Sequence, residues 1–150
     1  MGASLITVHA TGGGDMLQAA VDSAGRTCGV LAVTVLTSLG AEGLSESWGR
    51  AVDRMEDEVL RLAEIARAAG AHGIVCAARE AGAVRAAHGE ALRILVPGIR
   101  LSGGAAHDQS RVATPAEAAS SGANYVVIGR AVTEADDPRR VMREVREVLG

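Results

Sequence analysis

Lysine and phenylalanine are both missing from this sequence of 150 residues, and Trp48 and Tyr125 are its only aromatic residues. All 15 basic residues are arginine, so this chain by itself offers no lysine ammonium for proton transfer and no amine for a Schiff base. With so few aromatic rings there is no stacking platform for single-stranded nucleic acid. The formal net charge of −3 also argues against nucleic acid as a partner, because proteins that bind it carry basic patches. The core must be built from Ala, Val, Leu and Ile.

Long apolar runs are lacking as well. No stretch approaches the roughly 20 apolar residues of a membrane span, so no membrane partner is expected. Residues 1–4 show no basic segment of a secretory signal. Cys28 and Cys76 adjoin strand-like apolar runs, which favours two buried free thiols and a cytoplasmic location. The histidines have no metal-binding spacing, so we expect neither a metal site nor a cofactor.

What the sequence does contain is a strand followed by a helix, five times over. Continuous apolar stretches rich in β-branched residues predict strands covered on both faces, as in a parallel sheet. The predicted strands are residues 5–9, 29–36, 74–76, 93–96 and 125–128. The 19 glycines suit the tight turns between strands and helices. Because no internal linker or repeat interrupts this pattern, we expect one domain over residues 1–150.

Helix signals fill the intervals between these strands. Asp15 is expected to cap an amphipathic helix that has Met16 on its buried side. Apolar residues at three- and four-residue steps predict the longest helix from residue 52 onward, ended by Gly70. A further short helix is predicted at residues 81–88.

The last two helices have clear starting signals. Thr114-Pro115-Ala116-Glu117 has the form of a capping box, and Asp137-Pro138 is expected to cap the final helix. Residues 37–47 and 99–113 are predicted to be loops. The second of these is long and polar, which is typical of a functional segment.

Five successive strand–helix units imply an α/β fold with a parallel sheet and right-handed crossovers. Two architectures remain open, an open doubly wound sheet or part of a (β/α)8 barrel. Both bind ligands at the carboxyl ends of their strands, so the residues at those ends are the candidates for a functional site.

Groups suited to an anion stand at the ends of the last two strands. Arg100 follows the fourth strand, Gly129 and Arg130 follow the fifth, and Gln109 lies in the long loop between them. Arginine binds phosphate with two parallel N–H donors, and a strand-end glycine lets backbone N–H groups approach a ligand. The sequence therefore predicts a phosphate site. The alternative is a strand-end Gly-Arg whose arginines form ordinary surface ion pairs.

A set of short motifs, in order along nearly the whole chain, resembles landmarks of the orotidine 5′-phosphate decarboxylase family. The motifs are Val8-His9-Ala10 with Gly12-Gly13, Val33-Thr34-Val35-Leu36-Thr37-Ser38, Val75-Cys76-Ala77-Ala78-Arg79-Glu80, Pro97-Gly98-Ile99-Arg100, Asp108-Gln109-Ser110-Arg111 and Val127-Ile128-Gly129-Arg130. The last three together are highly specific. The related sugar-phosphate decarboxylases would not be expected to carry them.

The resemblance implies a partial (β/α)8 barrel of the ribulose-phosphate-binding type, in which this chain supplies strands four to eight. It assigns Arg100, Gln109, Gly129 and Arg130 to the phosphate of a nucleotide monophosphate, either orotidine or uridine 5′-monophosphate. It assigns Thr37 to the pyrimidine end of the same ligand. It assigns no catalytic residue to this sequence.

The family's decarboxylation in pyrimidine biosynthesis uses an Asp-x-Lys-x-x-Asp motif on the third barrel strand. That motif is absent from these 150 residues, and no lysine here replaces it. We therefore expect a decarboxylase homologue that keeps the phosphate-binding half and is inactive alone. The alternative is a non-catalytic assembly module. Five barrel strands leave two exposed edges, which favours a homo-oligomer or an N-terminal partner chain.

Overall fold

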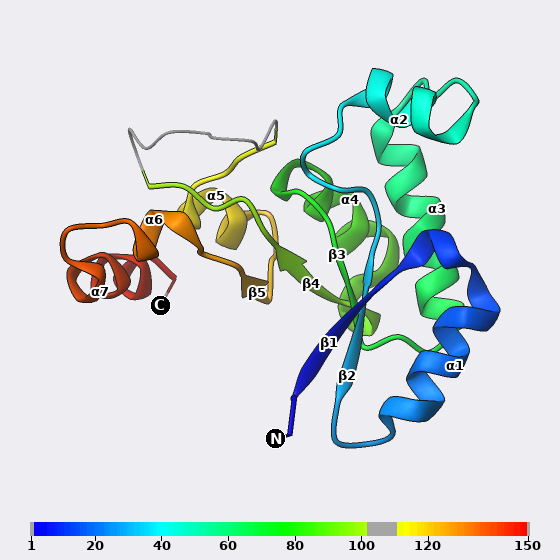
Figure 1. The fold of residues 1–150 in the computed structure, drawn as a ribbon, viewed down its shortest axis with the longest axis horizontal. Helices are drawn as coiled ribbons and strands as arrows, with labels where there is room; N and C mark the ends of the chain where they lie inside the picture. The colour runs from blue at the N-terminus through cyan, green and yellow to red at the C-terminus, as the bar shows by residue number, and fades with distance from the viewer. Residues whose placement is uncertain (1, 102–110, 150) are drawn as a thin grey trace.

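The computed structural model describes residues 2–101 and 111–149, and within them five parallel strands form one sheet (Figure 1). The strands are β1 (Leu5–His9), β2 (Gly29–Val33), β3 (Gly73–Val75), β4 (Arg93–Val96) and β5 (Tyr125–Val126). Each strand pairs with the next one along the chain. A doubly wound sheet would reverse its strand order at a switch point, so this order identifies a segment of a barrel.

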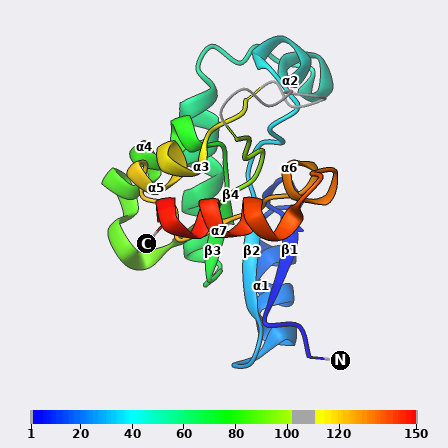
Figure 2. The ribbon, with the colours of Figure 1, turned by 90° about the vertical axis from the view of Figure 1, so that its left-hand side faces the viewer.

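The helices form a second layer, which packs alongside the sheet in chain order. They are α1 (Gly14–Ala24), α2 (Ala41–Trp48), α3 (Met55–Ala68), α4 (Ala78–His88), α5 (Pro115–Ser120), α6 (Arg130–Thr133) and α7 (Pro138–Leu149). Contacts run from α1 to α3, then to α4, α5 and α7. Figures 1 and 2 show this series passing around the sheet from α1 at one end to α7 at the other. Such a succession of neighbouring helices is the outer ring of a barrel.

The core between these layers is aliphatic, as the composition predicts. The largest fully buried side chains are Leu17, Leu31, Leu44, Leu62, Ile74, Leu92, Ile94, Ile99, Val59, Val84, Val96 and Val145. Trp48 is partly buried and packs against this core. In the described ranges, no helix has the length and apolarity needed to cross a membrane.

The start of α1 differs from the prediction. Gly13, not Asp15, is the N-cap, and Asp15 lies within the first turn. The buried stripe is displaced by one position, because Leu17 is fully buried whereas Met16 is 39% exposed. The φ of 89° at Gly13 explains the offset, since this left-handed conformation lets the chain turn directly into the helix.

The interval between β2 and α3 was predicted to be a loop, and that prediction is wrong for α2. Gly40 caps this helix, Leu44 is buried, and Gly49 ends it in a left-handed conformation. Leu44 and Trp48 are four residues apart and both pack inward. Glycine and serine are frequent in this interval and are typical of loops, so the helical spacing of Leu44 and Trp48 was missed.

Three strands, β2, β3 and β5, end earlier than predicted, and β2 and β5 do so because their neighbours end. Thr34 leaves the ladder by donating both its backbone N–H (3.1 Å) and its hydroxyl (2.7 Å) to the Val75 carbonyl, where β3 stops. Val127 still donates to Val96 at 3.0 Å. Beyond that point Gly98, with a φ of 72°, turns the chain of β4 away from β5.

Candidate functional site

Buried polar side chains gather at one end of the sheet. All those in the described ranges lie in the segments that follow β2, β3 and β4: Thr34, Thr37, Glu80, Arg100 and Arg111. Burying such groups costs free energy unless they are hydrogen-bonded or paired. Their concentration at the carboxyl ends of parallel strands marks this end, uppermost in Figure 1, as the candidate site.

Arg100 is held closely by its own segment. It is only 9% exposed, its backbone N–H donates to Ala113 at 2.8 Å, and its Nη1 donates to the Ile99 carbonyl at 2.9 Å. Ala113 donates in turn to Gly98 at 3.3 Å. The chain therefore returns after residue 110 to lie beside the segment that carries Arg100, and a short parallel bridge forms there.

Gly129 and Arg130 follow the neighbouring strand β5, as the sequence predicts. Gly129 is the N-cap of α6 and Arg130, half-buried, is the first residue of that helix. No described atom lies within 4 Å of the position that a Cβ on Gly129 would occupy. Packing among the described residues therefore does not require glycine here, and none of them fills the space beside this backbone.

Two further predicted residues complete the set. Thr37 is 8% exposed and stands in the segment after β2, at the same end of the sheet. Gln109 lies outside the described residues. Arg100, Gly129, Arg130 and Thr37 thus belong to one end of the sheet, on segments after β2, β4 and β5.

The structure adds a pair that the sequence did not single out, Arg111 and Glu80. Arg111 Nη1 lies 2.8 Å from Glu80 Oε1, and the two side chains are 2% and 3% exposed. The Nη2 of Arg111 donates to the carbonyls of Val35 (3.1 Å) and Leu36 (2.9 Å). Burial lowers the pKa of Arg111, and the charge of Glu80 opposes that shift. Both residues stand in conspicuous motifs, but their contact joins positions 31 apart and cannot be read from either motif.

Cys76 is buried close to this pair, in surroundings that disfavour its thiolate. Burial, followed by the negative charge of Glu80, raises the pKa of its thiol to about 12. Among the described residues, no group of three or more His, Cys, Asp or Glu is placed to hold a metal ion.

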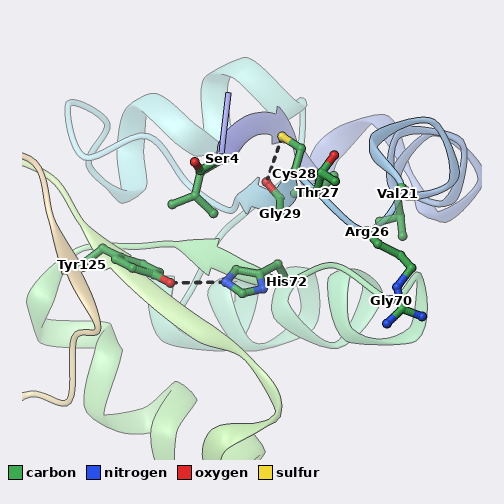
Figure 3. Close-up of a pocket in the computed structure, with 12 residues that line it drawn as sticks. Ser4, Val21, Arg26, Thr27, Cys28, Gly29, Gly70, His72 and Tyr125 are labelled. Atoms are coloured by element: carbon green, nitrogen blue, oxygen red, sulfur yellow. Dashed lines mark hydrogen bonds between the residues drawn. The ribbon is translucent and has the colours of Figure 1, made fainter. Parts of the chain in front are cut away.

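A cavity of about 580 Å³ lies at the opposite end of the sheet, where the chain enters the strands (Figure 3). Ser4, Cys28, His72 and Tyr125 are among its lining residues, and His72 Nε2 is 3.3 Å from the Tyr125 hydroxyl. None of the predicted site residues lines it. Parallel α/β folds bind ligands at the other end of the sheet, so this cavity is not the candidate site.

Strand order, the succession of contacting helices and polar groups at the carboxyl ends of the strands together define a segment of a β/α barrel. The chain belongs to the orotidine 5′-phosphate decarboxylase / HUMPS family, whose model matches residues 1–145. This confirms the resemblance seen in the motifs.

Individual relatives agree with this assignment. An orotidine 5′-phosphate decarboxylase of Anaeromyxobacter sp. (strain K) is 51% identical over 144 residues, covering 96% of this chain and 63% of the relative. One of Gluconobacter oxydans is 42% identical, covering 98% and 64%. The crystal structure of the Lactobacillus acidophilus enzyme superposes with a TM-score of 0.82 at 30% identity, covering 98% of this chain and 63% of that one. The chain therefore spans a little under two thirds of these proteins.

Proposed function

We propose that this chain forms the phosphate-binding part of a site for orotidine 5′-monophosphate and its product, uridine 5′-monophosphate. Arg100, Gln109, Gly129 and Arg130 bind the phosphate, and Thr37 lies toward the pyrimidine. The observation that carries the proposal is the burial of Arg100 at the carboxyl end of β4, beside the strand that leads to Gly129 and Arg130. Membership of the family supports the choice of ligand.

The geometry suits an anion that binds at the carboxyl ends of the strands. Arg100 has its backbone and one guanidinium nitrogen fixed by Ala113 and Ile99, so little conformational freedom is lost when it binds. Open space beside Gly129 admits a ligand oxygen to the backbone. Arg130 supplies a second planar guanidinium, and two such groups match the charge of a phosphate monoester.

These residues account for binding but not for decarboxylation. Loss of CO2 from the substrate leaves negative charge on C6 of the pyrimidine, which must be stabilised and then protonated. The sequence has no lysine to do so, and arginine, with a pKa above about 12, is a poor proton donor. We propose that the 150-residue chain alone binds the nucleotide without turning it over.

Calorimetric titration with uridine 5′-monophosphate tests this function. Saturable binding is expected, and Arg130→Ala should weaken it at least tenfold, since a lost charge-assisted hydrogen bond costs about 1.5–3 kcal/mol. Arg146→Ala, an exposed arginine on α7, is the matched control and should leave the affinity unchanged. Absence of binding by the wild-type chain, or equal losses in both variants, would contradict the proposal.

A second function, as a module that assembles with other chains, is favoured by the exposed margins of the sheet. Among the described residues, β1 pairs only with β2 and β5 only with β4. Ile6 in β1 is 37% exposed and Val127 after β5 is 48% exposed. Unpaired edges with apolar side chains favour association, either with a second copy or with a chain that supplies further strands.

A further inference from the structure

One buried guanidinium connects the segments after three different strands. Arg111 donates from Nη2 to the carbonyls of Val35 and Leu36, which follow β2. It also donates from Nη1 to Glu80, which lies in α4 after β3. Two residues further along, Ala113 accepts the backbone N–H of Arg100, which follows β4.

The connected segments are those that carry the two ends of the proposed ligand site. Thr37, assigned to the pyrimidine end, comes directly after Leu36, whose carbonyl accepts from Arg111. Arg100, assigned to the phosphate end, is paired to Ala113, in the same segment as Arg111. The relative placement of the two ends therefore depends on the arginine between them.

We propose that Arg111, held by Glu80, is a positioning residue that sets the spacing between Arg100 and Thr37, and hence selects a phosphate joined to a nucleoside over a free phosphate. This inference rests on the proposed function. Arg111 is not placed to bind the ligand itself, because both of its terminal nitrogens already donate to Glu80, Val35 and Leu36. It acts only through the segments that it joins.

The chemistry of the contact requires arginine in particular. One carboxylate and two carbonyls accept from the two terminal nitrogens of a single planar group. A lysine ammonium is a compact charge on a flexible stem and does not reproduce this fork. Glu80 offsets the burial of the positive charge and fixes the guanidinium plane.

The test compares two probes in the folded chain. Arg111→Lys should weaken binding of uridine 5′-monophosphate at least tenfold, measured by calorimetry well below the unfolding temperature. Binding of inorganic phosphate, followed by phosphorus NMR, should weaken less than threefold, because phosphate alone needs no fixed distance to Thr37. Arg79→Ala is the control. Arg79 also binds Glu80 Oε1, at 2.7 Å, but is 60% exposed, so its loss should change neither affinity.

The effect of Thr37→Ala on nucleotide affinity tests the positioning role of Arg111 further. If Arg111 only stabilised the fold, this effect would be the same with and without Arg111→Lys. In the Arg111→Lys background, Thr37→Ala should add less than a threefold loss, whereas alone it should cost more. If Arg111→Lys does not fold, Glu80→Gln, which keeps an acceptor for Arg111, should lower the nucleotide affinity selectively. Parallel losses for nucleotide and phosphate, or additive losses with Thr37→Ala, would overturn the inference. Failure of the wild-type chain to bind the nucleotide would instead remove the proposed function.

Discussion

Three charged side chains, those of Glu80, Arg100 and Arg111, are buried at the carboxyl end of the sheet. The rest of the described core has no buried charged residue. Arg111 and Glu80 are almost fully enclosed, and Arg111 Nε and Glu80 Oε2 have no hydrogen-bond partner among the described residues. Removing one member of such a pair leaves the other charge uncompensated, at a cost of about 3–5 kcal/mol. A pair of aliphatic residues could fill the same volume without this risk. The chain therefore retains at this end an arrangement that stability alone does not require.

The two cysteines should differ sharply in reactivity because of the same burial. With a pKa of about 12, Cys76 is thiolate in roughly one molecule in ten thousand at pH 8, and its side chain is inaccessible. Cys28 is half-buried and lines the cavity at the other end of the sheet. Titration of the native chain with Ellman's reagent should show one thiol reacting readily. Cys28→Ala should abolish that reaction, and rapid modification of Cys76 in the folded variant would contradict the burial argument.

At the scale of whole elements, the sequence predicted correctly those boundaries that depend on residues close together in the chain. β1 and β4 match their predicted ranges because each short apolar run is followed closely by residues typical of turns, Gly12-Gly13 and Pro97-Gly98. The capping box at Thr114 and the cap at Asp137, which accepts from the Arg140 N–H at 3.0 Å, are also confirmed. α6 was not predicted, since a helix of four residues presents no periodicity.

The same division holds for the candidate site. The strand ends predicted that Arg100, Gly129 and Arg130 lie on one side of the sheet, and the structure has them there, because parallel strands bring their carboxyl ends to one side. Thr37, assigned by the resemblance, lies at the same end, and the binding roles of these residues stay predictions. The Arg111–Glu80 pair was missed, since it depends on how the segment after residue 110 returns over α4. The sequence could predict which end of the sheet carries the candidate ligand site. It could not predict the Arg111–Glu80 contact that joins the segments at that end.

The capping box of α5 is expected to contribute measurably to stability. Thr114 accepts the Glu117 N–H at 3.2 Å, and the Glu117 carboxylate accepts the Thr114 N–H at 2.7 Å. Thr114→Ala should lower the free energy of unfolding by about 1 kcal/mol, measured by urea denaturation at pH 7. Ser120→Ala, near the other end of α5, is the control and should be close to neutral.

The effect of Thr114→Ala should also depend on pH. Hydrogen bonds from the backbone and hydroxyl of Thr114 lower the pKa of Glu117 below 4.5. A carboxylate whose pKa is depressed by folding stabilises the native state above its unfolded pKa and loses that contribution as pH falls through the folded pKa. The difference between wild type and variant should therefore shrink in acid. A difference that stays constant from pH 7 to pH 3 would show that Glu117 is not coupled to the cap.

For the molecule as a whole, the sheet follows a barrel's strand order without closing in the described residues. Its outer face carries a ring of contacting helices, while β1 and β5 each have one strand neighbour. In a closed barrel every strand has two, and exposed edges disappear. Completion by additional strands would satisfy both edges and enclose the end of the sheet that carries Arg100 and Arg130. The assembly proposal and the need of decarboxylation for a lysine that this sequence lacks thus converge on one requirement, a second polypeptide segment.

Complementation tests that requirement directly. The partner chain is the portion of the Anaeromyxobacter sp. (strain K) decarboxylase that this chain does not match, about a third of its length. Analytical ultracentrifugation of the 150-residue chain alone should show self-association, because its unpaired strand edges can pair with those of a second copy.

Mixing the 150-residue chain with the partner chain should replace the self-associated species by a mixed complex that decarboxylates orotidine 5′-monophosphate, while neither chain is active alone. Arg130→Ala should lower kcat/KM of the complex at least tenfold. A clean monomer would contradict self-association, and turnover by the 150-residue chain alone would contradict its dependence on a lysine from elsewhere.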